Sequence, residues 1–356
     1  MCPYAMKQRI KAVVFPAPNQ IQVLEFDLQE CGPEDVLVRS IYSMVSSGTE
    51  LRCLSGSAEF PMIPGYATIG EIIAVGEKVT GYRVGDLITG RSCPRFVLGI
   101  NQPCGGHASH HVFPATGEDR PVLLPPGAKP LDYVMAEPGS ISLRGVDGAR
   151  PQTGETAVVI GQGLIGALSA AWLHSRGCRV IVSDFEQRRL DRAMGWGAAA
   201  AVKGSEPDAE ARIRTLINQG ADIVVESSGA IPGVKLAFSL IKPKPRGAQG
   251  SGFYRGEPIA SHVGQWSRLI MQASYEKEIS VHPHGFFPGE GVTILTPSDR
   301  SWEDRQRSVE GIRKGEIKAA SFLDKVISFE EAPTAYFAMR DDKNATFSLV
   351  FDWAKA

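Results

Sequence analysis

Two different spacings of apolar residues divide the chain. From residue 10 to 150, short apolar stretches such as KAVVF, DVLVRSIYS and TIGEIIAVG are separated by turns that contain Gly, Pro or Asp. Short strands cut by such turns are typical of all-β structure. We therefore expect a small β-barrel in this part of the chain.

The pattern changes after residue 153. The runs TAVVI, RVIVSD and DIVVESSG are apolar and strand-like, and the segments GLIGALSAAWLHSRG and QRRLDRAMGWGA between them have helical periodicity. Alternating strands and helices predict a parallel sheet covered by helices. After about residue 290, further helix and strand patterns predict an α+β tail that completes the first domain. We expect one domain over 1–150, completed by 291–356, and a second over 151–290.

Composition excludes several classes of partner. The 356 residues include 38 basic and 39 acidic side chains, so the chain has no strong field to attract nucleic acid or anionic lipid. The first residues lack the apolar core of a signal peptide, and no apolar run is long enough to span a bilayer. The six cysteines form no CxxC pair, which favours reduced thiols. These features predict a cytoplasmic protein with a small-molecule substrate and without nucleic-acid or membrane partners.

A glycine-rich turn joins the first strand after residue 153 to the helix that follows it. In this context Gly161 allows the tight turn, Gly163 lets the backbone approach a pyrophosphate, and Gly166 lets helix and strand pack closely. The helix N-terminus adds free N–H donors and a positive dipole end. The candidate cofactor-binding residues of this turn are Gly161, Gln162, Gly163, Leu164, Ile165 and Gly166.

An acidic residue ends the next strand at the expected distance. Asp184 lies 18 residues after Gly166, where a carboxylate would accept the adenosine ribose hydroxyls and repel a 2′-phosphate. NAD is therefore favoured over NADP. Phe185 follows directly and is a further candidate contact. Arg189 either flanks the ribose or belongs to a solvated helix face.

The domain order and several short motifs resemble the medium-chain dehydrogenase/reductase family, which includes zinc alcohol and polyol dehydrogenases. Residues 47–50 are similar to the family's Cys-Gly-Thr-Asp, 64–67 to its Pro-Gly-His-Glu, and 76–86 to its V-G-x-x-V-x-x-x-x-x-G-D segment. Residues 105–108 resemble Gly-Gly-Phe-Ala, and 136–138 the Glu-Pro of polyol dehydrogenases. The resemblance implies an α/β protein with a GroES-like β-barrel domain and a Rossmann doubly wound parallel sheet. It also implies a homodimer or tetramer.

The chain departs from this family at the zinc positions. Ser47, Tyr66 and Ala67 stand where the family has its Cys, His and Glu ligands, and none of them is a good zinc ligand. At most Cys93 and Cys104 remain of the four cysteines of the structural-zinc lobe. We therefore expect no metal.

Other side chains must then assist proton transfer. His107 is the first candidate, because histidine exchanges protons near neutral pH. Thr49 matches the residue that passes the alcohol proton onward in the family, or serves only as a turn residue. Tyr66 either hydrogen-bonds the substrate oxygen or fills the emptied metal cavity. Glu137 could orient His107 or Tyr66, bind a substrate hydroxyl, or pair with an arginine. The candidate catalytic residues are His107, Tyr66, Thr49, Ser47 and Glu137, and Ser228 is placed by the resemblance in the cofactor groove.

Together these features predict a zinc-independent NAD(H)-dependent oxidoreductase. It would transfer hydride between nicotinamide and a secondary alcohol or ketone of a hydroxyl-rich small molecule, such as a sugar, a cyclitol or a biosynthetic intermediate. Some motifs are also similar to bacteriochlorophyllide hydroxyethyl dehydrogenases, which gives an alternative substrate. Quinone or enoyl reduction is another alternative, although Asp184 argues against the NADPH that such enzymes prefer. A nucleotide-binding protein without turnover is the remaining one.

Overall fold

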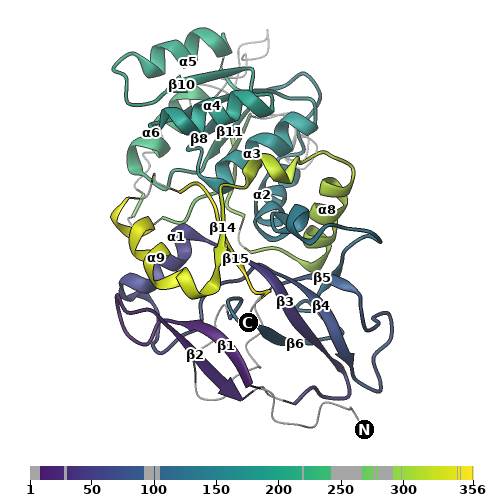
Figure 1. Ribbon diagram of the computed structural model, residues 1–356. Coiled ribbons are helices and arrows are strands. Elements are labelled where there is room, and N and C mark those ends of the chain that lie inside the picture. Colours follow the sequence, from purple (N-terminus) through teal and green to yellow (C-terminus); the bar gives the residue numbers. More distant parts are fainter. Residues whose placement is uncertain are drawn as a thin grey trace. The chain divides into compact units, whose positions relative to one another are not determined.

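The computed structural model describes residues 9–27, 30–91, 100, 105–218, 220–241, 267–275, 278–279, 292–297, 299–342, 344, 346–354 and 356. The chain forms two compact units (Figure 1). Unit 1 comprises Met1–Pro138 and Ser301–Ala356, and unit 2 comprises Gly139–Arg300. The sequence predicted that the chain passes from one domain to the other after residues 150 and 290. In the structure the first crossing falls inside helix α2 (Ala136–Gly148), where no break in the sequence pattern marks it.

The described part of unit 1 is built on a seven-stranded sheet. Its strand order is β14-β15-β3-β4-β5-β7, and β6 pairs with β3. The C-terminal tail completes this sheet, because β15 pairs antiparallel with β3. The strands are β3 (Asp35–Val45), β4 (Thr68–Val75), β5 (Leu87–Gly90), β6 (His110–Pro114), β7 (Val122–Leu123), β14 (Lys325–Ser328) and β15 (Leu349–Asp352), with β1 (Arg9–Val14) and β2 (Gln22–Asp27) as a separate hairpin pair.

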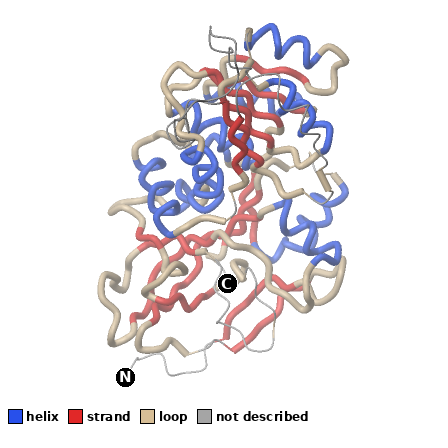
Figure 2. The backbone as a smooth tube through the Cα atoms, turned by 180° about the vertical axis from the view of Figure 1, so that it is seen from behind, coloured by secondary structure: helices blue, strands red, loops and turns tan. Residues whose placement is uncertain are grey.

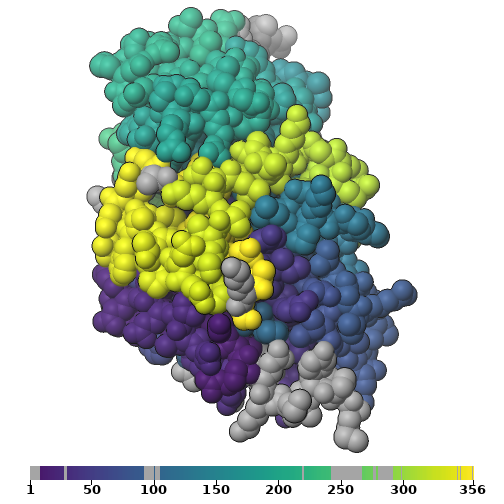
Figure 3. Space-filling model, viewed as in Figure 1, coloured from purple at the N-terminus to yellow at the C-terminus, as the bar shows by residue number. Residues whose placement is uncertain are grey.

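Helices of unit 1 connect the N-terminal and C-terminal parts of the chain. Helix α9 (Ala332–Asp341) contacts both β2 and α1 (Ser47–Arg52), so C-terminal residues lie against N-terminal ones, as the yellow and purple surfaces in Figure 3 show. Helix α8 (Trp302–Arg313) begins with a capping box in which Ser301 and Asp304 satisfy each other's backbone N–H groups. Short helical turns lie at η1 (Cys53–Ser57), η2 (Pro130–Tyr133), η4 (Ala319–Phe322) and η5 (Phe329–Glu331).

Unit 2 contains a parallel sheet with helices packed around it (Figure 2). Among the described residues its strand order is β10-β9-β8-β11-β12-β13, and every neighbouring pair is parallel. Counted along the chain this is the order 3-2-1-4-5-6 of a doubly wound dinucleotide-binding sheet, with the reversal between β8 and β11. The predicted Rossmann sheet is therefore confirmed. The strands are β8 (Thr156–Ile160), β9 (Arg179–Asp184), β10 (Ala200–Lys203), β11 (Ile223–Glu226), β12 (Ser267–Met271) and β13 (Val292–Leu295), and the helices are α3 (Leu164–Ser175), α4 (Gln187–Trp196), α5 (Ala209–Ile217) and α6 (Ile231–Leu240).

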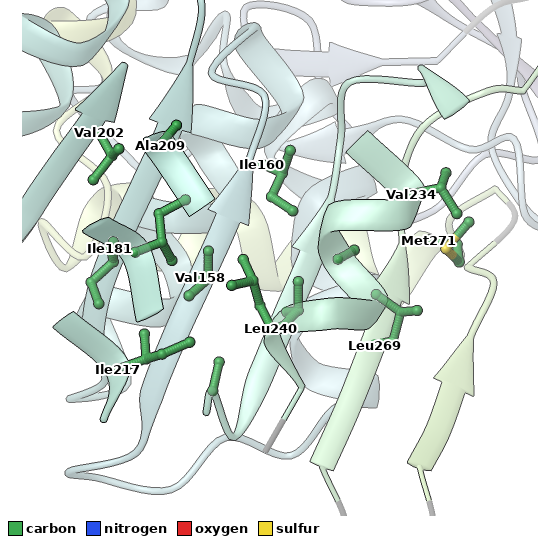
Figure 4. Packing of buried hydrophobic residues seen from close by; sticks show 14 residues of the cluster. Val158, Ile160, Ile181, Val202, Ala209, Ile217, Val234, Leu240, Leu269 and Met271 are labelled. Atoms are coloured by element: carbon green, nitrogen blue, oxygen red, sulfur yellow. The ribbon is translucent and has the colours of Figure 1, made fainter. Parts of the chain in front are cut away.

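An apolar core holds this sheet to its helices. Val158 and Ile181 of neighbouring strands pack with Ile217 of α5 and Leu240 of α6 (Figure 4). Each such side chain contributes roughly 1.5–3 kcal/mol when fully buried. This packing fixes the strand ends on which the functional loops lie. No helix in the described part of the chain is both long and apolar enough to cross a membrane.

Candidate active site

The glycine turn of unit 2 connects β8 to α3. Gly161 has a φ of +86°, a left-handed conformation that favours glycine, and a Cβ there would lie 2.8 Å from the Ser228 nitrogen. A Cβ on Gly166 would collide with the Gly161 carbonyl oxygen. A Cβ on Gly163, in contrast, would meet no described heavy atom within 4 Å. Gly161 and Gly166 are therefore packed against other parts of the protein, whereas the space beside Gly163 is open.

The open side of the turn is the N-terminus of helix α3. Gly163 is the N-cap residue, and its carbonyl oxygen accepts from the Ala167 N–H at 2.9 Å. Leu164 and Ile165 form the first helical turn and are half-buried. Because the N-cap has no side chain, the first N–H groups and the positive end of the helix dipole can receive an anion such as a pyrophosphate.

Asp184 is tied directly to this turn. Its Oδ2 accepts from the Gln162 N–H at 2.6 Å, and its Oδ1 accepts from the Glu186 N–H at 2.8 Å. Arg189 Nη1 lies 3.5 Å from Asp184 Oδ2. The neighbouring Phe185 is 65% exposed. The residue types and their arrangement fit a dinucleotide, with the carboxylate placed for a ribose and the helix end for the phosphates.

Ser228 lies beside the turn but is engaged elsewhere. Its N–H donates to Glu226 Oε1 at 2.9 Å, and its hydroxyl donates to the same oxygen. The sequence pointed to Ser228 and missed Glu226, a carboxylate with no exposed area.

In unit 1, three predicted residues gather at the start of α1. Ser47 is exposed and Thr49 is half-buried. Tyr66 is also half-buried, and its hydroxyl donates to Ser46 Oγ at 2.7 Å. The structure thus brings the phenol and the Ser47–Thr49 segment to one place.

Beneath this segment lies a buried polar network centred on Glu50. Its Oε1 accepts from the Ser46 N–H at 2.7 Å. Its Oε2 accepts from His107 Nε2 at 3.0 Å and from the Tyr336 hydroxyl. Glu50, His107 and Tyr336 are each at most 1% exposed. The carboxylate is therefore fully used inside the protein.

The Glu50 carboxylate, which can only accept, sets the direction of the hydrogen bonds at His107. Trp353 Nε1–H can only donate, and it donates to Ser43 Oγ at 2.8 Å. His107 Nε2–H therefore donates to Glu50 Oε2, and Nδ1 of the neutral imidazole accepts from the Ser43 hydroxyl at 2.7 Å. The imidazole also packs under Gly65, where a Cβ would lie 2.7 Å from the ring. His107, the first candidate for proton transfer, is thus enclosed, with both ring nitrogens bonded internally.

Sequence reasoning could not find most of this network. Tyr336 and Trp353 lie 286 and 310 residues from their partners, and no local pattern links residues at such separations. Glu50 had a usable signal, since it occupies the acidic position of the Cys-Gly-Thr-Asp motif that residues 47–50 resemble.

Glu137 pairs with an arginine. It is 1% exposed, and Arg305 Nη1, on an equally buried side chain, lies 3.7 Å from its Oε1. Of the alternatives that the sequence left open for Glu137, the arginine pair is the contact found in the structure.

The donor set at the zinc positions does not fit a zinc ion. Ser47 and Tyr66 offer a hydroxyl and a phenol, which are poor zinc ligands near neutral pH, and Ala67 has no donor. The nearby carboxylate and imidazole are bonded to each other. Across the described ranges, no three His, Cys, Asp or Glu residues are grouped to hold a metal ion. Cys93 and Cys104 lie outside the described residues.

Two family models match the chain, one within each unit. Residues 32–120 match the model of the alcohol dehydrogenase GroES-like domain, and residues 165–274 match that of the zinc-binding dehydrogenase. D-xylulose reductase A from Aspergillus oryzae is 26% identical over 307 residues, which cover 80% of this chain and 78% of that protein. Sorbitol dehydrogenase from Halalkalibacterium halodurans is 24% identical over 332 residues, which cover 87% of this chain and 89% of that protein.

Solved structures share the whole fold. A protein described as a zinc-binding dehydrogenase from Sinorhizobium meliloti, bound to NADP, has a TM-score of 0.80 at 22% identity, covering 97% of this chain and 100% of its own. The alcohol dehydrogenase rspB from Escherichia coli, complexed with NADH, has a TM-score of 0.80 at 20% identity, with 97% and 99% covered. The chain belongs to the medium-chain dehydrogenase/reductase family, a family of oxidoreductases. The predicted GroES-like and Rossmann architecture is confirmed.

Proposed function

We propose that the protein is an NAD(H)-dependent oxidoreductase that interconverts a secondary alcohol and a ketone on a hydroxyl-rich small molecule, without zinc. The observation that carries this proposal is the Asp184 carboxylate at the end of β9, bonded to the Gln162 N–H of the glycine turn. The relatives named for D-xylulose and sorbitol support a sugar or polyol substrate.

The preference for NAD rests on charge. The solved neighbours carried NADP in one case and NADH in the other, so family membership alone does not decide between them. A 2′-phosphate beside Asp184 would face a carboxylate of like charge. Arg189 is a nearby cation, and its Nη1 lies 3.5 Å from Asp184 Oδ2. The positive charge of the guanidinium is therefore balanced by the Asp184 carboxylate.

When bound, nicotinamide supplies the hydride donor or acceptor. The residues of this chain must hold the dinucleotide and exchange the proton of the alcohol. Of the predicted catalytic residues, His107 and Glu137 are enclosed, whereas the hydroxyls of Ser47 and Thr49 and the phenol of Tyr66 are not. We assign proton exchange to these hydroxyl groups. We assign to His107 a positioning role, because its hydrogen bond to Glu50 fixes the carboxylate that accepts from the Ser46 N–H at the start of α1.

The donor chemistry of the same segment supports zinc independence. The nearby Glu50 carboxylate and His107 imidazole are bonded to each other and to Ser46 N–H and Ser43, so they offer no open ligand set. The network would hold the start of α1 in place without a metal.

The test is a dinucleotide and substrate panel. We expect NAD⁺ reduction with sorbitol or related polyols, NADH oxidation with D-xylulose or related ketoses, and much slower reactions with NADP⁺ and NADPH. Equal rates with both dinucleotides would contradict the role of Asp184, and a chain that binds neither would contradict the proposal as a whole.

A cytoplasmic location and a homodimer or tetramer remain predictions. Light scattering tests the predicted oligomeric state.

A further inference from the structure

A buried carboxylate lies beside the glycine turn of unit 2. Glu226 is the last residue of β11, and it stands in register with Ile160 at the end of β8, at the reversal of the strand order. Its Oε1 accepts from the N–H and the hydroxyl of Ser228. Its Oε2 accepts from the Tyr275 hydroxyl at 2.6 Å and from the Gly229 N–H at 3.3 Å. Four donors therefore converge on one carboxylate with no exposed area.

The loop that Glu226 holds, residues 227–229, packs against the glycine turn. A Cβ on Gly161 would lie 2.8 Å from the Ser228 nitrogen and 2.9 Å from the Ser227 carbonyl carbon. A Cβ on Gly166 would lie 3.1 Å from Ser227 Cβ. The Ser227 N–H also donates to the Ile160 carbonyl oxygen at 2.8 Å, just before the turn begins. A shift of residues 227–229 would therefore be transmitted to the turn.

Glu226 itself is held from two further directions. Helix α6 packs so closely that a Cβ on Gly233 would lie 2.7 Å from Glu226 Oε1. Tyr275, which follows β12, donates from the other side. Burial, together with its hydrogen bond to Glu226, raises the pKa of Tyr275 above its usual value, so its phenol stays a proton donor. The carboxylate thus joins the ends of β11 and β12 and the start of α6.

We propose that Glu226 is a positioning residue for the dinucleotide, which acts by fixing the loop 227–229 against the Gly161–Gly166 turn. This inference rests on the proposed function, since it concerns the same cofactor site. It assigns no contact between Glu226 and the cofactor. It predicts that Glu226 affects dinucleotide binding at the glycine turn, and not at Asp184, because the loop 227–229 contacts Gly161 and Gly166.

The test compares the affinities of the full-length protein for NADH and for adenosine. Glu226→Gln removes one acceptor oxygen, and Tyr275→Phe removes one donor. Loss of a hydrogen bond to a charged group should weaken NADH binding by about tenfold for Glu226→Gln and about three- to fivefold for Tyr275→Phe. Adenosine has no phosphate and depends on Asp184, so its affinity should change by less than about twofold.

Tyr82→Phe is the matched control. It also removes one phenol hydrogen bond, from Tyr82 to the Pro121 carbonyl oxygen at 2.7 Å, but in unit 1. We expect it to leave NADH affinity unchanged. Should Glu226→Gln fail to fold, Tyr275→Phe carries the test alone.

Two results would overturn the inference. One is an unchanged NADH affinity in the variants while the wild type binds NADH. The other is an equal loss for NADH and adenosine, which would indicate general damage to unit 2. A wild-type protein that binds neither NADH nor NADPH would instead refute the proposed function itself.

Discussion

The network around Glu50 makes a quantitative prediction for Glu50→Gln. The glutamine side chain has one acceptor oxygen and one amide nitrogen with two N–H donors, whereas Glu50 accepts from Ser46 N–H, His107 Nε2 and the Tyr336 hydroxyl. With the amide nitrogen at the Oε1 position it faces the Ser46 N–H, and at the Oε2 position it forces His107 and Tyr336 to reverse their hydrogen bonds or face a donor. Either costs about 1–3 kcal/mol, and the remaining bonds lose their charge assistance. Removal of the buried charge offsets part of this. We expect the free energy of unfolding to fall by about 2–4 kcal/mol.

Urea unfolding, followed by circular dichroism, measures this loss. Glu71→Gln is the matched control, because Glu71 pairs with Arg39 at 2.6 Å but the two side chains are 33% and 57% exposed. An exposed pair of this kind contributes at most about 1 kcal/mol. If Glu50→Gln costs no more than Glu71→Gln, the network does not hold the segment at α1, and the argument for its structural role fails.

Three further predictions concern the cofactor site and the response to pH. Asp184→Ala should weaken NADH binding and narrow its advantage over NADPH, whereas Asp191→Ala on helix α4 should do neither in the same fluorescence titration. Gly161→Ala should weaken NADH by more than about tenfold because its Cβ would lie 2.8 Å from the Ser228 nitrogen, while Gly85→Ala, at a similar φ of +92° but in open space, should leave affinity intact. Burial holds the pKa of His111 down at about 3, so between about pH 6.5 and 3 the unfolded chain binds more protons and the free energy of unfolding falls as pH falls. His111→Gln should reduce that slope by up to about 1.4 kcal/mol per pH unit in urea titrations, and an unchanged slope would count against the buried, neutral imidazole.

How much the sequence could predict depended on how local each signal was. The glycine turn and Asp184 follow from spacing within one βαβ unit, and the hydrogen bond between Gln162 and Asp184 agrees with that expectation. The parallel sheet covered by helices followed from the alternation of strand and helix patterns. The passage of the chain from unit 1 to unit 2 lies inside a continuous helix, which has no sequence mark.

The environment of polar side chains was harder to foresee. His107 and Ser228 were found as chemically capable residues, but their partners were not. His107 is bonded to Glu50 and Ser43, 57 and 64 residues away, and a residue's type does not reveal whether it will be enclosed. Sequence patterns predicted which groups could react, and the tertiary packing decided which of them face inward.

We propose that this family member oxidises an alcohol with NAD⁺ and without zinc. The most direct measurement is the rate of NADH formation from NAD⁺ and an active polyol by enzyme dialysed against a strong chelator and shown to be free of zinc. We expect the same rate as for untreated enzyme, with no gain on addition of zinc. A rate that disappears on chelation and returns with one zinc ion per chain would contradict it, because Ser47, Tyr66 and Ala67 provide no ligand set for that ion.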